Sequence, residues 1–275
     1  MLSKIKTEPF LKWTGGKGQL LSQYQPYLPK TFNNYYELFL GGGALFFHLQ
    51  PHNSFLADIN HRLINTYRWV RDDVEAVILE LKSHAQNHSE TYYSQIRLEY
   101  NQSKSLDLEQ AARLIYLNKT CFNGLYRENS NGVFNVAIGK YEKLSICQEE
   151  KLWQAAKVLA GVTLEIGTYS QFLHKLQPGD FVYLDPPYVP ISSTSNFTTY
   201  SPEGFGQFQH LLLKEDALKL HGRGVKVLIS NSECEFVRQI YSEQCWKIES
   251  VSAARSINSK TNARGKISEI IIRNY

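Results

Sequence analysis

The residues best suited to chemistry are Asp185, Pro186, Pro187 and Tyr188, which directly follow an apolar run at 181–184. Such a run is typical of a buried parallel strand, and open α/β sheets bind ligands beyond the carboxyl ends of their strands. Because proline carries no N–H, we expect the carbonyls of Asp185 and Pro186 to stay free as acceptors. Acceptors beside an aromatic ring suit a planar amino group, such as that of adenine or cytosine, whose nitrogen attacks an electrophile. The tetrapeptide alone also fits a Pro-Pro turn with a solvated aspartate.

A glycine turn and a second aspartate offer a further place for a ligand. The glycines at 41–43 join an expected strand at 34–39 to an apolar helix start at 44–47, so a ligand can approach the backbone and meet a helix amino terminus. Asp58 ends another expected strand, at 54–57, where an acidic side chain accepts hydrogen bonds from ribose hydroxyls. The alternatives are a plain tight turn for the glycines and a helix cap for Asp58.

Two common nucleotide-binding motifs do not match this sequence. The spacing at 41–43 is not G-x-G-x-x-G, which disfavours NAD. The segment 10–17 ends in Gly-Gly-Lys but is not a P-loop, because Leu11 stands at the first glycine position and Gly18 follows the lysine. The sequence therefore favours neither a dinucleotide enzyme nor a P-loop nucleotidase.

Composition sets broad limits on the function. With 275 residues, 43% of them hydrophobic, the chain can bury one core and a small second lobe, and a net charge of +4 permits a polyanionic partner without requiring one. Cys121, Cys147, Cys234 and Cys245 lack C-x-x-C spacing and histidines at metal-ligand intervals, so we expect free thiols and no metal. Residues 1–6 lack an apolar signal segment, and no apolar run is long enough to cross a membrane. We therefore expect a cytoplasmic protein without membrane contact.

Helical periodicity distinguishes the middle of the chain from the segments on either side. Apolar residues recur at i, i+3, i+4 and i+7 in 74–81, 108–115 and 152–159. Successive helices with no strand between them do not fit a βαβ rhythm. The pattern therefore predicts an inserted, mainly helical lobe at 62–160.

Local signals refine this division. Asp107 and Gln110 form a capping-box pair before one of the helices. Asn131-Gly132 is a strong two-residue turn signal, and with the apolar residues at 133–136 it predicts a β-hairpin in the lobe. After a loop at 192–195, the α/β pattern resumes with a helix near 205–220 and strands at 226–230, 247–251 and 268–273.

The segments 10–17 and 37–43, Asp58 and the tetrapeptide at 185–188 resemble, in that order, the alpha-class, Dam-type DNA adenine-N6 methyltransferases. The resemblance implies an α/β fold, with a Rossmann-like SAM-dependent methyltransferase sheet and an inserted, mainly helical target-recognition lobe that carries a β-hairpin. Residues 1–61 and 161–275 would form the SAM-binding catalytic domain, and 62–160 the DNA-binding domain. The likeness covers nearly the whole chain, including 118–141, 190–200, 229–231 and 255–257.

This resemblance implies roles for individual residues. Lys12, Leu125 and Arg127 match positions implicated in reading the DNA site, and Phe122 and Asn123 match residues that fill the gap left by a flipped base. Ala137 stands where the closest Dam-type hairpins carry proline, which affects the readout of one base pair. The candidate catalytic residues are Asp185, Pro186, Pro187 and Tyr188; the candidate cofactor-binding residues are Trp13, Lys17, Glu37, Phe39, Gly41, Gly43, Asp58 and Asp185; and the candidate DNA-binding residues are Lys12, Phe122, Asn123, Leu125, Arg127, Lys140 and Tyr141.

The implied reaction is methyl transfer from S-adenosyl-L-methionine to adenine N6, in the sequence GATC. The amino lone pair is delocalised into the ring, so acceptors at Asp185 and Pro186 would hold its hydrogens and favour a pyramidal nitrogen for direct in-line attack, with no metal and no covalent enzyme intermediate. Because that amino group is buried in a duplex, the base must be flipped out, and stacking on Tyr188 would offset part of the cost.

Other functions remain open on the sequence alone. A protein or RNA methyltransferase can use a similar tetrapeptide but has no need of a basic hairpin with Arg127, Lys140 and Lys143. A non-catalytic DNA-binding protein that kept the fold has no need of Asp58 and Asp185. An adenine methyltransferase with another recognition sequence is a third alternative. The expected partner is double-stranded DNA, and a cognate restriction enzyme is possible.

Overall fold

The computed structural model describes residues 7–190, 205–254 and 266–275. The chain divides into two compact units. The first unit contains residues 1–16, 41–50 and 57–167, and the second unit contains residues 17–40, 51–56 and 168–275. The expected loop at 192–195, the matched segment 255–257 and most of the matched segment 190–200 lie outside the described residues.

The strands of the described chain form one mixed sheet. They are β1 (Tyr35–Glu37), β2 (Ser54–Asp58), β3 (Thr163–Ile166), β4 (Phe181–Leu184), β5 (Lys226–Ser232), β6 (Lys247–Ala254) and β7 (Lys266–Arg273), in the order β3-β2-β1-β4-β5-β7-β6. β1 is parallel to β2 and β4, and β4 is parallel to β5, whereas β7 runs antiparallel to both β5 and β6. This confirms the predicted α/β class with a Rossmann-like sheet; β3 was not predicted.

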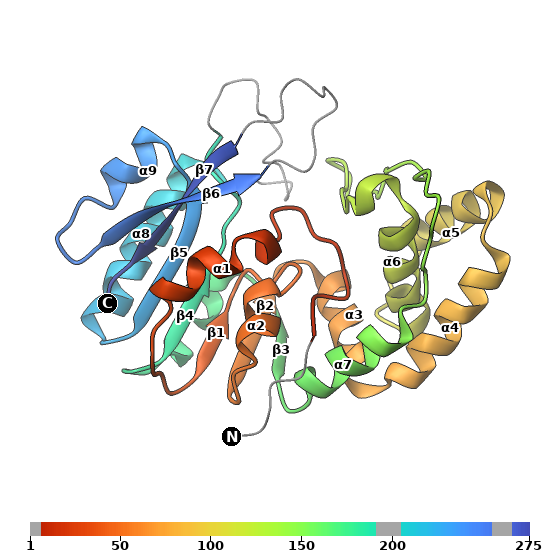
Figure 1. The fold of residues 1–275 in the computed structure, drawn as a ribbon, viewed down its shortest axis with the longest axis horizontal. Coiled ribbons are helices and arrows are strands. Elements are labelled where there is room, and N and C mark those ends of the chain that lie inside the picture. The colour runs from red at the N-terminus through yellow and green to blue at the C-terminus, as the bar shows by residue number, and fades with distance from the viewer. Residues whose placement is uncertain (1–6, 191–204, 255–265) are drawn as a thin grey trace. The chain divides into compact units, whose positions relative to one another are not determined.

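The strand that leads to the tetrapeptide, β4, and its neighbour β1 are central and buried. Every residue of β1 and β4 is buried, as expected for parallel strands that are covered on both faces. Phe181 lies between Tyr35 of β1 and Lys226 of β5 in the register of the sheet. Figure 1 shows α8 (Gln207–Gly222) along β5, which it contacts. The remaining helical segments of the second unit are α1 (Leu21–Tyr24), α9 (Glu235–Ile240), η1 (Lys17–Gln19), η2 (Gln25–Tyr27) and η4 (Tyr169–Lys175).

The first unit is mainly helical. The predicted apolar stripes at 74–81, 108–115 and 152–159 lie on α4, α6 and α7, and their residues are buried except for a half-buried Leu108, so these helices are confirmed. The assignment of 62–160 to target recognition stays a prediction. The helical segments of this unit are α2 (Ala44–Leu49), α3 (His61–Asp72), α4 (Val74–Asn87), α5 (Glu90–Gln102), α6 (Leu108–Thr120), η3 (Phe122–Gly124) and α7 (Glu149–Leu159).

The predicted capping box at the start of α6 forms only in part. The Asp107 carboxylate accepts a hydrogen bond from the Gln110 backbone N–H at 2.8 Å, as expected for an N-cap. The Gln110 side chain, however, is buried and makes no hydrogen bond within the described residues. The reciprocal bond of a capping box is therefore missing, because Gln110 faces the interior and does not reach back to the cap.

The predicted hairpin turn contains three residues rather than two. The Asn129 N–H donates to the Val133 carbonyl at 3.0 Å, and the Gly132 N–H donates to the Asn129 carbonyl at 2.9 Å. Gly132 has φ +70°, the left-handed conformation that closes a three-residue loop. The Asn129 side chain accepts from the N–H groups of Asn131 and Val133, which fixes the start of the turn. The flanking chain pairs through isolated antiparallel bridges, not through continuous strands.

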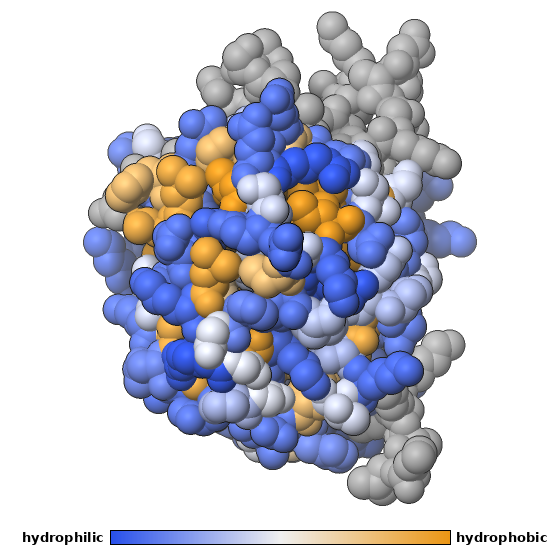
Figure 2. Space-filling view, turned by 90° about the vertical axis from the view of Figure 1, so that its left-hand side faces the viewer, coloured by the Kyte–Doolittle hydropathy of each residue, from blue (hydrophilic) through white to orange (hydrophobic). Residues whose placement is uncertain are grey.

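The outer face of α8 is partly apolar. Phe208, Leu211 and Leu212 are exposed, while Leu213, Ala217 and Leu220 form the buried face of the same helix. Figure 2 shows the side of the molecule where Figure 1 places α8 and α9, and apolar patches alternate there with hydrophilic side chains.

The described part of the chain lacks both a membrane-spanning helix and a cluster of metal-ligand side chains. None of its helices is long and apolar enough to cross a membrane. Within the same residues, no group of three or more His, Cys, Asp and Glu side chains is arranged to hold a metal ion.

Candidate active site

In the second unit, the Asp185 carboxylate is held by two side chains. Its Oδ2 lies 3.0 Å from Nζ of Lys17, and its Oδ1 accepts a hydrogen bond from Ser230 Oγ at 2.6 Å. Lys17 is only 4% exposed, so this ion pair is shielded from solvent on the lysine side. Because a serine hydroxyl has one hydrogen and Ser230 gives it to Asp185, the Tyr183 hydroxyl 3.0 Å away must donate to Ser230. The carboxylate is thus fixed in one orientation at the end of β4.

Tyr188 is fixed at its hydroxyl and covered on one ring face. The hydroxyl donates to Glu269 Oε2 at 2.8 Å, and Lys17 Nζ lies 4.6 Å from the ring centroid. A base that stacks on this ring while the lysine stays in place must therefore use the opposite face. The predicted role of Tyr188 as a stacking platform stays a prediction.

Glu269 on β7 belongs to this cluster and was not found from the sequence. Its carboxylate lies 4.0 Å from Lys17 Nζ. Burial raises the pKa of Glu269, and the nearby Asp185 charge acts in the same direction, while Lys17 and the Tyr188 hydroxyl oppose the shift. The ammonium group of the buried Lys17 thus lies near the carboxylates of Asp185 and Glu269 and near the Tyr188 ring. The sequence marks Glu269 only as an acidic residue directly before the apolar run 270–272.

The backbone just after the tetrapeptide is clamped by the end of β5. The Val189 N–H donates to Asn231 Oδ1 at 3.1 Å, and the Val189 carbonyl accepts from Ser232 Oγ at 2.6 Å. Asn231 Nδ2 lies 3.4 Å from Nδ1 of His210 on α8. Burial lowers the pKa of His210 to about 4, so this imidazole is neutral near pH 7 and can accept from the amide. The clamp fixes the chain direction after Tyr188.

The other candidate cofactor residues of the second unit already have partners. Glu37 is buried on β1 and accepts a hydrogen bond from the Tyr35 hydroxyl at 2.7 Å. The Phe39 ring stacks on Tyr169 with 5.4 Å between centroids and meets Phe205 edge-on at 5.8 Å. Their cofactor roles stay predictions.

In the first unit, the Asp58 carboxylate is held by the backbone. Its Oδ2 accepts from the Gly41 N–H and its Oδ1 from the Asn60 N–H, each at 2.9 Å. Burial raises the pKa of Asp58, while these N–H groups lower it. Asp58 does not cap α3, because Asn60 does so by accepting from the Leu63 N–H at 3.0 Å. The carboxylate instead ties the end of β2 to the glycine turn, in which Gly41 and Gly43 both have positive φ.

Trp13 packs against the same turn. A Cβ added to Gly41 would lie 2.8 Å from Trp13 Cδ1, and one added to Gly42 would lie 3.2 Å from Trp13 Cβ. The indole also stacks on the Tyr126 ring, with 4.8 Å between centroids and 16° between planes. Two independent features therefore favour glycine at position 41: its φ of +48° and the close approach of the indole.

Asn118 connects the segment of Lys12 to the recognition candidates. Its amide accepts from the Lys12 N–H at 2.9 Å and donates to the Lys12 carbonyl at 2.7 Å and the Gly124 carbonyl at 3.1 Å. The Lys12 ammonium lies 5.8 Å from the ring centroid of Tyr141, whose hydroxyl donates to the Cys121 carbonyl. Lys12 and Tyr141 are thus neighbours, and their DNA-binding assignment stays a prediction.

The remaining DNA-binding candidates lie at or near the surface. Phe122 is 55% exposed, and Asn123 beside it has a φ of +55°, unusual for a residue with a side chain. Leu125 is half-buried and Arg127 is exposed, with Nε and Nη2 donating to Asn135 Oδ1 at 3.2 and 3.1 Å. Arg127 must therefore exchange this amide for a base edge if it reads DNA. Lys140 and the variant position Ala137 are also exposed.

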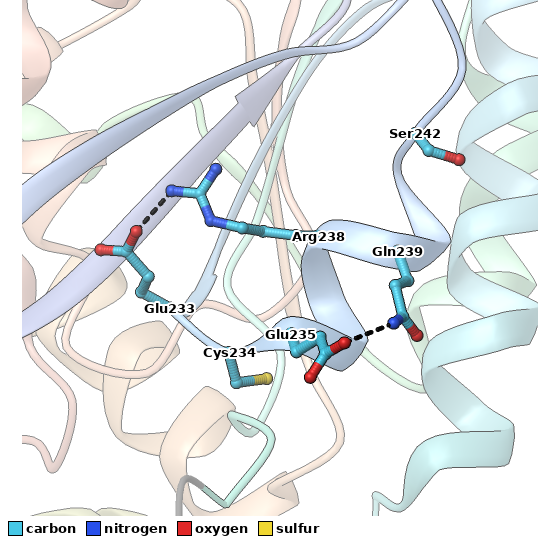
Figure 3. Close-up of a pocket in the computed structure, with 6 residues that line it drawn as sticks. All are labelled: Glu233, Cys234, Glu235, Arg238, Gln239 and Ser242. Carbon is cyan, nitrogen blue, oxygen red and sulfur yellow. Dashed lines mark hydrogen bonds and ion pairs between the residues drawn. The ribbon is translucent and has the colours of Figure 1, made fainter.

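A surface pocket beside α9 is separate from these candidates. Figure 3 shows Arg238 directed to the Glu233 carboxylate and Gln239 directed to Glu235, so these polar groups already have partners. None of the predicted site residues lines this pocket, whose lining residues are Glu233, Cys234, Glu235, Arg238, Gln239 and Ser242. It offers no group that the predicted chemistry requires.

Comparison with known proteins gives a consistent set of relatives. The model of one protein family, described as D12 class N6 adenine-specific DNA methyltransferase, matches residues 13–257. The type II methyltransferase M1.LlaDCHI of Lactococcus lactis subsp. cremoris is 39% identical over 99% of this chain and 97% of its own length. The type II methyltransferase M.MjaIII of Methanocaldococcus jannaschii is 37% identical over 98% of this chain and 100% of its own length. A DNA adenine methylase of Escherichia coli K12 is 35% identical over 97% of this chain and 95% of its own length.

Proposed function

The chain belongs to the D12 class N6 adenine-specific DNA methyltransferases, and we propose that it uses S-adenosyl-L-methionine to methylate adenine in GATC after flipping the base out of the duplex. The observation that carries this proposal is the cluster at the end of β4. Asp185 is oriented by Lys17 and Ser230, next to an aromatic ring that Glu269 holds by its hydroxyl.

The residues present fit a nucleoside-type methyl donor. The Gly41 and Asn60 N–H groups hold the Asp58 carboxylate in place, and we assign this carboxylate to a ribose hydroxyl of the donor. Trp13 offers an aromatic ring beside the same turn, and we assign Lys17 and Asp185 to the donor as well, following the family resemblance. S-Adenosyl-L-methionine, when bound, supplies an electrophilic methyl group on its sulfonium sulfur.

Asp185 and Pro186 act on the attacking nitrogen. The Asp185 carboxylate accepts one hydrogen of the adenine amino group and the Pro186 carbonyl accepts the other, so the N6 lone pair is turned toward the methyl group. Because Lys17 and Ser230 already hold Asp185 in one orientation, this acceptor needs no reorganisation when the base arrives. The two hydrogen bonds that hold the Val189 backbone also restrict the position of the adjacent Tyr188.

Capture of the flipped base is assigned to aromatic side chains. Flipping costs a few kcal/mol, and stacking on a ring such as Tyr188 contributes about 1–3 kcal/mol per base. Phe122 and Asn123 are both exposed and so are available to fill the vacated position in the duplex. These assignments rest on the family resemblance together with exposure.

Recognition of GATC is assigned to the segment next to Phe122. Arg127 can donate two hydrogen bonds to a guanine edge from the nitrogens that now donate to Asn135, and Leu125 can contact a thymine methyl group. Lys12 would assist in reading, while Lys140 and Tyr141 would contact the DNA backbone. Alanine at 137 would loosen discrimination at the outer base pairs.

The test is methyl transfer from labelled S-adenosyl-L-methionine to duplexes that differ only in one site. A duplex with one GATC should be methylated on adenine, and a duplex with a scrambled site should not. Arg127→Ala should lose about 1–3 kcal/mol of discrimination at one guanine-containing pair and keep the others. Equal labelling of both duplexes by the wild-type protein would refute the recognition proposal while leaving adenine methylation intact.

Two proposals concern the cellular setting. The relatives from Lactococcus lactis and Methanocaldococcus jannaschii are named type II methyltransferases, and we propose a restriction enzyme of the same specificity as a partner here. A DNA substrate also favours location in the cytoplasm. Source-cell extracts should then cut unmethylated DNA at the methylated sequence, and extracts without that activity would contradict the partner.

A further inference from the structure

Tyr126 of the first unit contacts the cofactor candidate Trp13 and adjoins the base-reading candidates in the sequence. Its ring stacks on Trp13, and its chain neighbours are Leu125 and Arg127. We propose that Tyr126 is a positioning residue that couples occupation of the methyl-donor site to the placement of Leu125 and Arg127 on DNA. This inference rests on the roles proposed above for those residues and for Trp13.

A series of hydrogen bonds and close approaches leads from Asp58 to Tyr126. Asp58 accepts the Gly41 N–H, a Cβ on Gly41 would touch the Trp13 indole, and the indole stacks on Tyr126. A second connection joins the same two segments, because the fully buried Asn118 amide holds both Lys12 backbone groups and the Gly124 carbonyl. A ligand that displaces or fixes Trp13 must therefore act on the segment that contains Tyr126.

The Tyr126 ring is anchored at its hydroxyl, so it cannot simply slide. The hydroxyl donates to Glu128 Oε1 and lies 3.0 Å from the hydroxyl of Tyr100. Glu128 is 3.7 Å from Nη1 of Arg62, and the Arg62 guanidinium lies 4.3 Å from the centroid of the Tyr100 ring. Tyr126 is 2% exposed and Tyr100 is fully buried. The indole thus stacks on a ring with one fixed position.

The position of Tyr126 determines where its neighbours point. Leu125 is extended, with φ −77° and ψ 104°. Side chains alternate in extended chain, and here Tyr126 is buried while Leu125 is half-buried and Arg127 is exposed. Because Tyr126 points inward, its two neighbours share the opposite side. The anchored Tyr126 ring therefore holds both base-reading candidates on that side together, and an indole that the donor keeps stacked on the ring stabilises this placement.

The competing explanation is that Tyr126 only fills the core. Removal of a core residue lowers stability and weakens DNA binding to the same degree whether or not the donor site is filled. Removal of a coupling residue changes the ratio of the two affinities, and such ratios are typically 5- to 150-fold. The ratio therefore separates the two roles, which catalytic activity alone would not do.

The experiment measures the dissociation constant of the full-length protein for a duplex carrying the sequence that it methylates in an expressing host, with and without saturating S-adenosyl-L-homocysteine. We expect the ligand to tighten wild-type binding about tenfold, within the usual range for coupled sites. Tyr126→Leu should reduce this ratio to below about twofold, and Tyr126→Phe should keep it because the ring remains. Thermal unfolding is recorded for each variant.

Tyr116→Leu is the matched control. Tyr116 is a fully buried tyrosine of the same unit that stacks on His84 and not on Trp13. Its loss should lower stability while the affinity ratio stays at the wild-type value. Should Tyr126→Leu fail to fold, Tyr126→Met fills the volume without a ring and is expected to lose the ratio equally.

A wild-type ratio of one, or a wild-type ratio retained in Tyr126→Leu, would overturn the coupling. Neither result touches the proposed function, which fails only if no adenine is methylated or if the methylated sequence is not GATC. Because the duplex is chosen from the methylated sequence itself, an error in the GATC assignment leaves the coupling test valid.

Discussion

Two aspartates, one in each unit, are held in opposite ways. Asp58 is bound by the backbone N–H groups of Gly41 and Asn60, whereas Asp185 is bound by the side chains of Lys17 and Ser230. Backbone N–H groups are neutral donors that do not titrate, and most substitutions leave them in place. A lysine ammonium is a full charge that one substitution deletes. The first arrangement suits the binding of an invariant ligand group, and the second suits a carboxylate that acts on a reacting centre.

The largest effect should come from Asp185→Ala. It removes the acceptor for the adenine amino hydrogens, and we expect the single-turnover rate to fall by about a thousandfold or more, the upper range for loss of one preorganised group. Asp185→Asn should retain some activity, because its amide oxygen still accepts. An alanine variant that turns over within twofold of wild type would show that the carboxylate has no catalytic role.

Lys17→Met should have the next largest effect. It deletes the partner of Asp185 and leaves Glu269 facing an unneutralised carboxylate, since the Asp185 charge already raises the pKa of Glu269. We expect the single-turnover rate at saturating donor to fall on the order of a hundredfold, as for loss of one charge-stabilising group. If only the donor affinity changes, Lys17 binds the cofactor without orienting Asp185.

Gly41→Ala tests the backbone-held aspartate in the same assay. The substitution strains a residue with φ +48° and brings its Cβ to 2.8 Å from Trp13, so it should disturb the Asp58 site. A cost of about 1–3 kcal/mol predicts donor binding weakened by about five- to 150-fold. The rate at saturating donor should stay close to wild type. A large loss of that rate would erase the distinction between the two aspartates.

The smallest effect is a change in the pH dependence of stability. Burial raises the pKa of Glu269 above its ordinary value of 4.5, so the folded protein binds this proton more tightly than the unfolded chain does. The free energy of unfolding should therefore fall as the pH rises from about 4.5 to the raised pKa. We expect this fall to be less than about 1 kcal/mol, and Glu269→Gln should abolish it. The measurement is urea unfolding at several pH values across that range. Glu142→Gln, at an exposed glutamate, is the control, and equal pH profiles for wild type and Glu269→Gln would refute the shift.

Elements fixed by nearby residues could be predicted from the sequence. β4 was visible as a continuous apolar run because both its faces are buried, and α4 and α7 were visible because their apolar positions repeat at helical spacing. The Asn-Gly pair predicts a two-residue hairpin turn, but the turn has three residues because the Asn129 side chain fixes its start. β3 shows no such apolar run, because Leu164 is its one buried residue.

Partners distant in the sequence could not be predicted. Glu269 meets Tyr188 only because β7 pairs with β5 in the sheet, and no local pattern around either residue records that pairing. No local pattern marks Tyr126 either, because its stacking partner Trp13 belongs to a segment remote in the sequence. The candidate residues could be named individually, but which of them hold one another depends on tertiary packing.

The measurement that tests the central claim most directly is the sequencing of methylated bases in DNA from a host that lacks adenine methylation and expresses this protein or its Asp185→Ala variant. We predict N6-methyladenine at GATC with the wild-type protein and none with Asp185→Ala at equal protein level. N6-methyladenine that persists with Asp185→Ala, or no methylated adenine with the wild-type protein, would contradict the assignment of the reaction to the cluster at the end of β4.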